Sequence, residues 1–180
     1  MPDQEVQLYL AASLDGYLAR PDGSVDWLKP FQGADYGPYA YEAFYAGVGS
    51  LVMGRHTYEQ ARGSGPWPYS GKPTAVLTRD YVLFPPPPPE VVFRRDDPAA
   101  VCSDLMSQAP GHVWLVGGGR VARSFLDAEL VDRIILHVMP LLLGDGIPLF
   151  LSSEQGAALQ LRDSRHFENG VVLLDYQVRR

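Results

Sequence analysis

The sequence predicts an α/β fold: a single, mixed but mostly parallel sheet flanked by helices, with a C-terminal antiparallel hairpin. Two observations lead to this expectation. Short apolar runs alternate with amphipathic segments along most of the chain, which is the pattern of parallel strands joined by helices. Near the C-terminus, two extended runs are joined at Asn169-Gly170, a strong signal for a tight hairpin turn. With 180 residues, 46% of them hydrophobic, the chain is expected to form one domain over residues 1–180.

The predicted strands are short runs of apolar and β-branched residues bounded by turn signals. They cover residues 6–12, 50–53, 74–78, 113–116, 134–139, 159–167 and 171–178. The first strand ends at Ser13-Leu14-Asp15-Gly16, where Asp-Gly marks a turn, and the second ends at Gly54. A loop rich in proline, glycine and aspartate is expected to follow the first strand, through residue 37.

Four helices are predicted between these strands. The first opens at Pro38, and its apolar stripe continues to Val48. The second covers residues 55–61 and the fourth covers residues 120–128. The third begins at Asp97-Pro98, because aspartate caps a helix and proline suits its first position.

Residues 85–89 are all proline and are expected to form a stiff, extended connector, since proline donates no backbone hydrogen bond. The alternative is a ligand for a proline-binding module.

Composition excludes several classes of function. The formal net charge is −6 and no dense block of basic residues occurs, which argues against nucleic acid as a partner. The N-terminus is acidic rather than basic, and residues 134–143 are too few to span a bilayer, so neither a signal peptide nor a membrane segment is expected. The single cysteine, Cys102, excludes an internal disulfide, and the four histidines lack metal-ligand spacing, so no metal site is expected. These features indicate a cytoplasmic protein.

Two turns from a strand into a helix are candidate anion sites. Gly117-Gly118-Gly119 lies between a buried strand and a helix, where glycine lets a ligand approach the backbone and the helix N-terminus offers free N–H groups. The run also satisfies G-x-G-x-x-G/A, but only about sixty residues follow, so a dinucleotide-binding Rossmann domain is rejected. The alternative is a tight turn without a ligand.

The second candidate turn is Gly54-Arg55-His56-Thr57. Here Arg55 can form a charge-assisted pair with a phosphate, and Thr57 can donate to it or simply cap the helix.

Four motifs in order resemble the dihydrofolate-reductase superfamily. They are Ser13-Leu14-Asp15-Gly16-Tyr17, Gly54-Arg55-His56-Thr57, the turn at 117–119, and the run from Leu141 through Gly144-Asp145-Gly146 to Phe150. The first narrows the resemblance to the reductase domain of the bifunctional riboflavin-biosynthesis deaminase-reductase and its stand-alone relatives. The resemblance extends from about Val6 to Val178.

The resemblance implies an NADPH site across the carboxyl ends of the strands. The residues expected to bind this cofactor are Ala12, Gly54, Arg55, Thr57, Thr78, Arg79, Gly117, Gly118, Gly119 and Arg120. Thr78 and Arg79 match the place where the superfamily commonly binds the adenosine 2′-phosphate. The alternative for Arg79 is a solvated residue paired with Asp80.

The substrate implied by the resemblance is a small pterin-, folate- or aminopyrimidine-type heterocycle. Asp15 is the first candidate for the catalytic polar group and Asp26 the second, with Ser13 and Trp27 as substrate-binding residues. Asp15 has the alternative of a turn aspartate that binds only its own backbone, and Trp27 that of an aromatic anchor for its loop. His137 is interpreted as a core or interface residue rather than a catalyst.

Two departures leave the natural substrate open. The riboflavin-pathway enzymes carry an Asn- or Asp-Pro segment early in the second nucleotide-contacting helix, and residues 58–63 lack it. Folate reductases place an acid in the first helix, where only Glu42 lies near a plausible position. A protein that binds or senses NADP(H) without turnover is the alternative function. A homodimer is expected, with the apolar stretch 134–142 at its interface or, alternatively, as a central strand.

Overall fold

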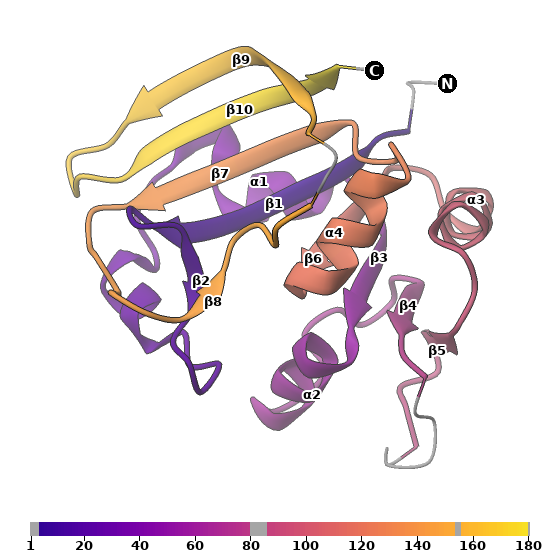
Figure 1. The fold of residues 1–180 in the computed structure, drawn as a ribbon. Helices are drawn as coiled ribbons and strands as arrows, with labels where there is room; N and C mark the ends of the chain where they lie inside the picture. The colour runs from indigo at the N-terminus through magenta and orange to yellow at the C-terminus, as the bar shows by residue number, and fades with distance from the viewer. Residues whose placement is uncertain (1–3, 80–85, 154–155, 180) are drawn as a thin grey trace.

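The computed structural model describes residues 4–79, 86–153 and 156–179 (Figure 1). Its eight-stranded sheet has the order β5-β4-β3-β6-β1-β7-β10-β9, and a separate two-stranded sheet pairs β2 with β8. The strands are β1 Val6–Ser13, β2 Tyr17–Ala19, β3 Val48–Gly54, β4 Thr74–Leu77, β5 Val91–Arg94, β6 His112–Gly117, β7 Arg133–Met139, β8 Ile147–Pro148, β9 Ala158–His166 and β10 Val172–Arg179. The helices are α1 Tyr41–Ala46, α2 Arg55–Gly63, α3 Pro98–Gln108 and α4 Gly119–Asp127, with 3₁₀ turns η1 Asp26–Phe31 and η2 Gly37–Tyr39.

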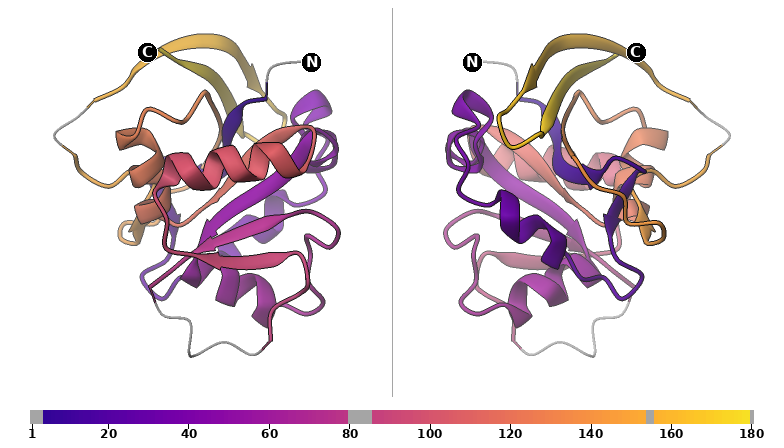
Figure 2. Two further views of the ribbon diagram at one scale, coloured as in Figure 1. Left: turned by 90° about the vertical axis from the view of Figure 1, so that its right-hand side faces the viewer. Right: turned by 90° about the vertical axis from the view of Figure 1, so that its left-hand side faces the viewer.

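The predicted fold class is confirmed. Six strands, from β5 across to β7, run parallel, and β10 then pairs antiparallel with β7 and with β9. Each strand is twisted and the twist accumulates across the sheet, so β9 and β10 run across the view of Figure 1 whereas β3 and β4 run steeply down it. The two turned views of Figure 2 show the same change of direction. The carboxyl ends of the parallel strands therefore meet at one edge of the sheet.

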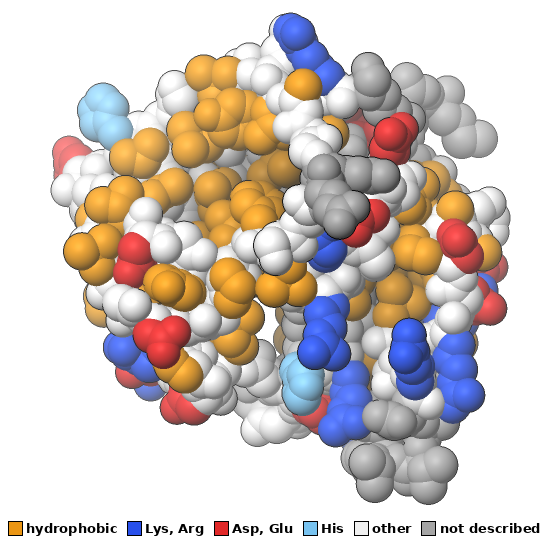
Figure 3. All heavy atoms as spheres, viewed as in Figure 1, with side chains coloured by type: hydrophobic (Ala, Val, Ile, Leu, Met, Phe, Trp, Pro, Cys, Tyr) orange, Lys and Arg blue, Asp and Glu red, His pale blue; other side chains and the backbone are white. Residues whose placement is uncertain are grey.

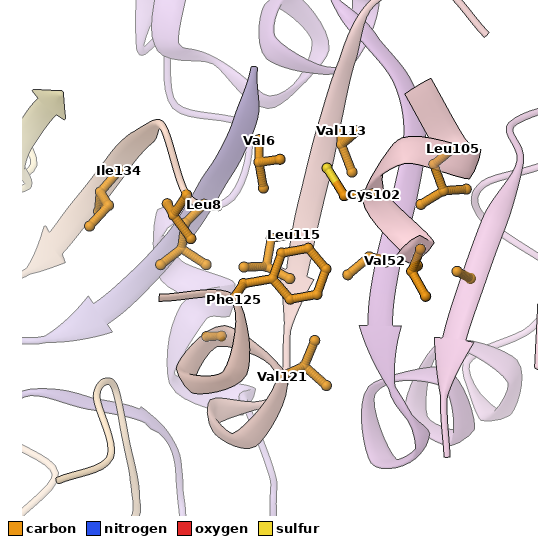
Figure 4. Packing of buried hydrophobic residues seen from close by; sticks show 14 residues of the cluster. Val6, Leu8, Val52, Cys102, Leu105, Val113, Leu115, Val121, Phe125 and Ile134 are labelled. Carbon is orange, nitrogen blue, oxygen red and sulfur yellow. The ribbon is translucent and has the colours of Figure 1, made fainter. Parts of the chain in front are cut away.

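Helices cover both faces of the sheet. α3 and α4 pack on one face through Val101, Leu105 and Phe125, where Phe125 is fully buried. Figure 4 shows its ring beside Leu115 of the sheet, in the cluster that also contains Leu8. Burial of such a side chain contributes roughly 1.5–3 kcal/mol to stability, so α4 is held firmly against β1 and β6.

The opposite face has an aromatic core in which Phe44 of α1 and Tyr58 of α2 are buried. Phe44 stacks on Tyr9 of β1 with ring centroids 4.0 Å apart. Trp114 of β6 contacts both rings edge-on. This core holds α1 over β1 and β6 and holds α2 beside β3 and β4.

The start of α3 agrees with its sequence signal. Asp97 is the N-cap, and its carboxylate accepts a 2.7 Å hydrogen bond from the backbone N–H of Ala99, with Pro98 in the first turn. Cys102 is buried on this helix, as expected for a core residue.

Two expectations about the N-terminal third were wrong in detail. The loop after β1 contains β2 and both 3₁₀ turns, elements too short to show a periodic pattern. The helix begins at Tyr41 rather than Pro38, which lies in η2, and it ends before Gly47. Val48 continues the apolar stripe in sequence but pairs with His112 of β6 as part of β3.

β5 was also missed, because four residues after a proline run carry little signal. Of the predicted polyproline segment, residue 85 lies outside the described residues, and the described prolines that follow it are in neither helix nor strand.

Candidate functional site

The two glycine turns lie side by side at the carboxyl edge of the sheet. β3 and β6 are hydrogen-bonded neighbours, with Met53 opposite Gly117. Each strand is followed directly by a helix, α2 after Gly54 and α4 after Gly118. The parallel pairing of β3 with β6 therefore brings together segments more than sixty residues apart in the chain.

At Gly118, any residue other than glycine would place a side chain in the space between the two turns. Gly118 has φ +88°, a conformation that side chains rarely adopt. A Cβ atom there would lie 3.6 Å from Thr57 Oγ1 and 3.7 Å from Gly54 Cα. Neither Gly54 nor Gly118 caps its helix with a side chain, so the first N–H groups of both helices can bind an anion.

The two arginines of these turns differ in their surroundings. Arg55 Nε donates a 3.0 Å hydrogen bond to Glu59 one helical turn later, whereas Arg120 is exposed at the start of α4. Gly119 is covered instead, since a Cβ atom there would lie 3.4 Å from Leu151 Cγ. Of the three glycines, Gly118 is therefore the one that faces the opposite turn.

A basic cavity lies next to the turns, at the ends of β4 and β5. Its volume is about 200 Å³, and it is lined by Leu77, Thr78, Arg79, Arg94, Arg95 and Asp96. The backbone N–H of Thr78 donates to the carbonyl of Arg94 at 3.0 Å, and the Arg95 guanidinium donates to the carbonyl of Arg79. Arg94 is engaged by the carboxylates of Asp96 and Asp104. We call this site the arginine cavity.

Thr78 and Arg79 were expected here from the sequence, but Arg94 and Arg95 were not. They reach the cavity because β5 pairs in parallel with β4, placing Arg94 opposite Leu77. The available signal was the run Val91-Val92-Phe93 followed by two arginines, which resembles a short strand with basic residues at its carboxyl end.

Asp15 joins two loops at the end of β1. Its carboxylate accepts hydrogen bonds from Ser13 Oγ at 2.6 Å and from the backbone N–H groups of Leu143 and Gly144 at 3.1 and 2.7 Å. The Ser13 hydroxyl, followed by these backbone groups, holds the pKa of Asp15 below its usual value. Asp15 is therefore ionised at neutral pH, and it binds the distant loop 141–146 as well as its own turn.

Ser13 and Ala12 lie beneath this turn. Ser13 is buried, and its hydroxyl also accepts a hydrogen bond from the backbone N–H of Tyr17 at 3.0 Å. Ala12 is buried as well, and because strand side chains alternate, its methyl group points to the sheet face opposite Ser13.

Asp26 and Trp27 are adjacent in sequence but lie in different environments. Asp26 is exposed and accepts a 2.8 Å hydrogen bond from Arg20, which keeps the pKa of its carboxyl low. Trp27 is 6% exposed and packs against Met139 and Val171, in a cluster that also includes Ala11. Of the two, only Trp27 lies against the end of β1.

Within the described residues, no three histidine, cysteine, aspartate or glutamate side chains come together as a metal site would require. No helix in the described ranges is long and apolar enough to cross a membrane.

The strand order, the paired glycine turns and the C-terminal hairpin define a protein with the dihydrofolate-reductase-like fold. The family model of the RibD C-terminal domain matches residues 4–173, and the chain belongs to this family. The resemblance inferred from the four motifs is therefore confirmed.

Relatives of similar length come from several bacteria. The uncharacterised protein YwjB of Bacillus subtilis is 33% identical over 95% of this chain and 97% of its own length. A Shewanella protein, provisionally named for riboflavin biosynthesis, is 28% identical with a TM-score of 0.84, covering 98% of this chain and 100% of its own.

A more distant structural neighbour is the Thermotoga maritima diaminohydroxyphosphoribosylaminopyrimidine deaminase/5-amino-6-(5-phosphoribosylamino)uracil reductase. It shares the fold with a TM-score of 0.73 at 17% identity, over 98% of this chain and 57% of that one.

Filling the space between the glycine turns should block binding of the NADPH that the sequence predicts for this site. In Gly118→Val, the added side chain would project toward Thr57 and Gly54, and we expect NADPH affinity to fall at least about tenfold, a loss of about 1.4 kcal/mol. Titration of NADPH by fluorescence, together with a melting curve, measures this. Gly71→Val is the matched control, because Gly71 also has a positive φ (+80°) but lies in an exposed loop with open space around it. Equal NADPH affinity in a folded Gly118 variant would remove this turn from the predicted cofactor site.

Proposed function

We propose that this protein is an NADPH-dependent oxidoreductase that reduces a small pterin-, folate- or aminopyrimidine-type heterocycle by hydride transfer. Membership of the RibD C-terminal domain family supports a reductase. The observation that carries the cofactor assignment is the pair of facing glycine turns, with the arginine cavity beside them.

The residues present fit a phosphorylated dinucleotide. N–H groups at the starts of α2 and α4 face a common space and would bind the pyrophosphate, aided by Thr57 and by the cations Arg55 and Arg120. The arginine cavity lies at the same edge of the sheet, at the ends of the neighbouring strands β4 and β5. It suits the 2′-phosphate, because guanidinium groups pair well with phosphate oxygens.

Bound NADPH would supply the hydride, and the protein would orient the reacting rings and exclude water. The nicotinamide is assigned to the end of β1 at Ala11, Ala12 and Ser13. Trp27 packs against this strand end and would contact the substrate ring.

Asp15 remains the first candidate for the polar catalytic role and Asp26 the second. The hydrogen bonds of Asp15 favour an ionised carboxylate that holds the loops at 14–17 and 141–146 together. We therefore assign Asp15 to positioning the substrate side of the site rather than to donating a proton. Asp26 lies in an exposed ion pair with Arg20.

The test of this function is a substrate panel. NADPH absorbance is followed with dihydrofolate, dihydropterins and aminouracils, including 5-amino-6-(5-phosphoribosylamino)uracil. Oxidation of NADPH that depends on one of these heterocycles supports a reductase. Tight NADPH binding without turnover of any of them would favour a sensing protein instead.

Removing the charge of Arg79 or Arg95 in the arginine cavity should weaken NADPH selectively. A hydrogen bond to a charged group contributes roughly 1.5–3 kcal/mol, so Arg79→Ala and Arg95→Ala should each weaken NADPH by about one to two decades while NADH changes little. The loss should shrink at high salt, because exposed charges are screened. Arg162→Ala on β9, at the other edge of the sheet, is the control for a lost surface charge. Equal loss of NADPH and NADH would contradict a 2′-phosphate site here.

Replacing Asp15 by asparagine should slow reduction with little effect on NADPH affinity. The amide keeps the size of the side chain, but only its oxygen can accept, so one of the two hydrogen bonds from Leu143 and Gly144 is lost and the two loops lose part of their connection. We expect turnover to fall about 10- to 1,000-fold, because misplacing a reacting group by about 1 Å can cost about 100-fold. Steady-state kinetics beside an NADPH titration measure it. Full turnover in this variant would shift the assignment to Asp26.

A homodimer is the proposed assembly. β9 and β10 present an apolar face on which Leu159, Leu161 and Val172 are 42%, 52% and 39% exposed. Figure 3 shows hydrophobic side chains gathered over this part of the sheet. Exposed apolar surface of this kind is typical of an interface. Light scattering should give about twice the chain mass of 19.8 kDa, and Leu161→Glu should lower it to one chain. A monomeric parent would refute the dimer.

A further inference from the structure

Two buried nitrogen atoms lack hydrogen-bond partners on the same part of the sheet. They are Nε1 of Trp27 and Nε2 of His137. The two residues are only 6% and 4% exposed, and neither nitrogen has a partner among the described residues. Buried polar atoms are normally paired, because an unpaired one loses its hydration without replacement. A polar ligand bound beside these two atoms would supply the missing hydrogen bonds.

Strand register puts His137 beside the proposed nicotinamide position. β1 and β7 run parallel, with Ala11 opposite His137 and Ser13 opposite Met139. Side chains that are paired in register point to the same face of a sheet, so His137 and Met139 share the face of Ala11 and Ser13. Trp27 packs on that same face, against Met139 and Ala11. Both unpaired nitrogens therefore belong to residues that lie beside Ala11 on one face of the sheet, and Ala11 has only a small side chain.

The imidazole of His137 is held in place by aromatic rings. Tyr9 and Tyr36 contact it edge-on, with centroid distances of 5.2 and 5.3 Å. Burial lowers the pKa of His137, although hydrogen bonding of its ring to the backbone of Leu10 and Tyr39 acts in the opposite direction. The ring is therefore neutral at pH 7, and a neutral imidazole can donate from one nitrogen and accept at the other.

We propose that Trp27 Nε1 and His137 Nε2 hydrogen-bond the polar edge of the substrate heterocycle, an assignment that rests on the proposed reductase function. The indole N–H can only donate, so it requires a carbonyl or an unprotonated ring nitrogen. Neutral His137 suits either a neighbouring ring N–H or a second carbonyl. Uracil and pterin rings present such groups side by side.

The chemistry of this edge also restricts what binds there. Neither Trp27 nor neutral His137 carries a charge, and burial of a phosphate or carboxylate without a counter-charge is strongly unfavourable. The uncharged ring edge is therefore the part that binds to Trp27 and His137, and any phosphate-bearing substituent of the substrate points away from them.

The test compares three variants that each remove one nitrogen. Trp27→Phe and His137→Leu remove the two proposed groups. Trp67→Phe is the matched control, because Trp67 Nε1 is also buried without a partner, but its ring packs against Tyr58 and Tyr69 in the aromatic core. Each variant is examined for melting temperature, NADPH affinity and steady-state kinetics with the heterocycle that the parent reduces.

We expect all three variants to bind NADPH as the parent does and to melt at the same temperature or higher, since an unpaired buried polar atom has been removed. The KM for the heterocycle should rise about tenfold or more in Trp27→Phe and His137→Leu and stay unchanged in Trp67→Phe. His137→Gln, which can still donate and accept, should recover much of this loss, and it serves as the second variant if His137→Leu does not fold.

Unchanged kinetics in folded Trp27→Phe and His137→Leu would overturn this assignment while leaving the reductase function in place. A parent that oxidises NADPH with none of the heterocycles would overturn the proposed function and this assignment with it.

Discussion

The parallel pairing of β3 with β6 is the constraint on which the rest of the site depends. It places Met53 opposite Gly117, so the two strands end, and the helices that follow them begin, at neighbouring positions on the same edge of the sheet. The glycine turns then face one another across a space that a side chain at Gly118 would narrow. Because both helices point their N-termini to this edge, their partial positive charges add at one place. An anion site follows from strand register before any basic side chain is considered.

Charged side chains extend this arrangement in two directions. At the ends of β4 and β5, arginines line a cavity in which Arg94 pairs with Asp96 and Asp104, and Arg79 and Arg95 add further positive charge. After the end of β1, both carboxylate oxygens of Asp15 accept hydrogen bonds that join two loops. In the proposed function, the cationic end would bind a phosphorylated cofactor and the carboxylate of Asp15 would shape the substrate end.

Near the end of β1, Trp27 and His137 place buried polar nitrogens where an apolar core would contain only carbon. Trp27 and His137 would be more favourable for stability as apolar residues, because their buried nitrogens lack partners among the described residues. A protein that only had to fold would gain by replacing them. Functional sites commonly depart from the most stable choice in this way, because a group prepared for a ligand is unsatisfied until the ligand arrives.

The sequence by itself determined the α/β class, the C-terminal hairpin, the Asp97 cap and the two glycine turns, because each depends on residues close together in the chain. It did not reveal β5 or the arginines that follow it, since four residues carry too little periodicity, and only pairing with β4 brings Arg94 and Arg95 beside Arg79. Sequence also left Asp15 and His137 ambiguous. Two partners of Asp15, the backbone N–H groups of Leu143 and Gly144, lie more than 120 residues away. Whether Nε2 of His137 has a hydrogen-bond partner depends on every group packed around it. Such properties arise from contacts between distant segments, and only the tertiary structure decides them.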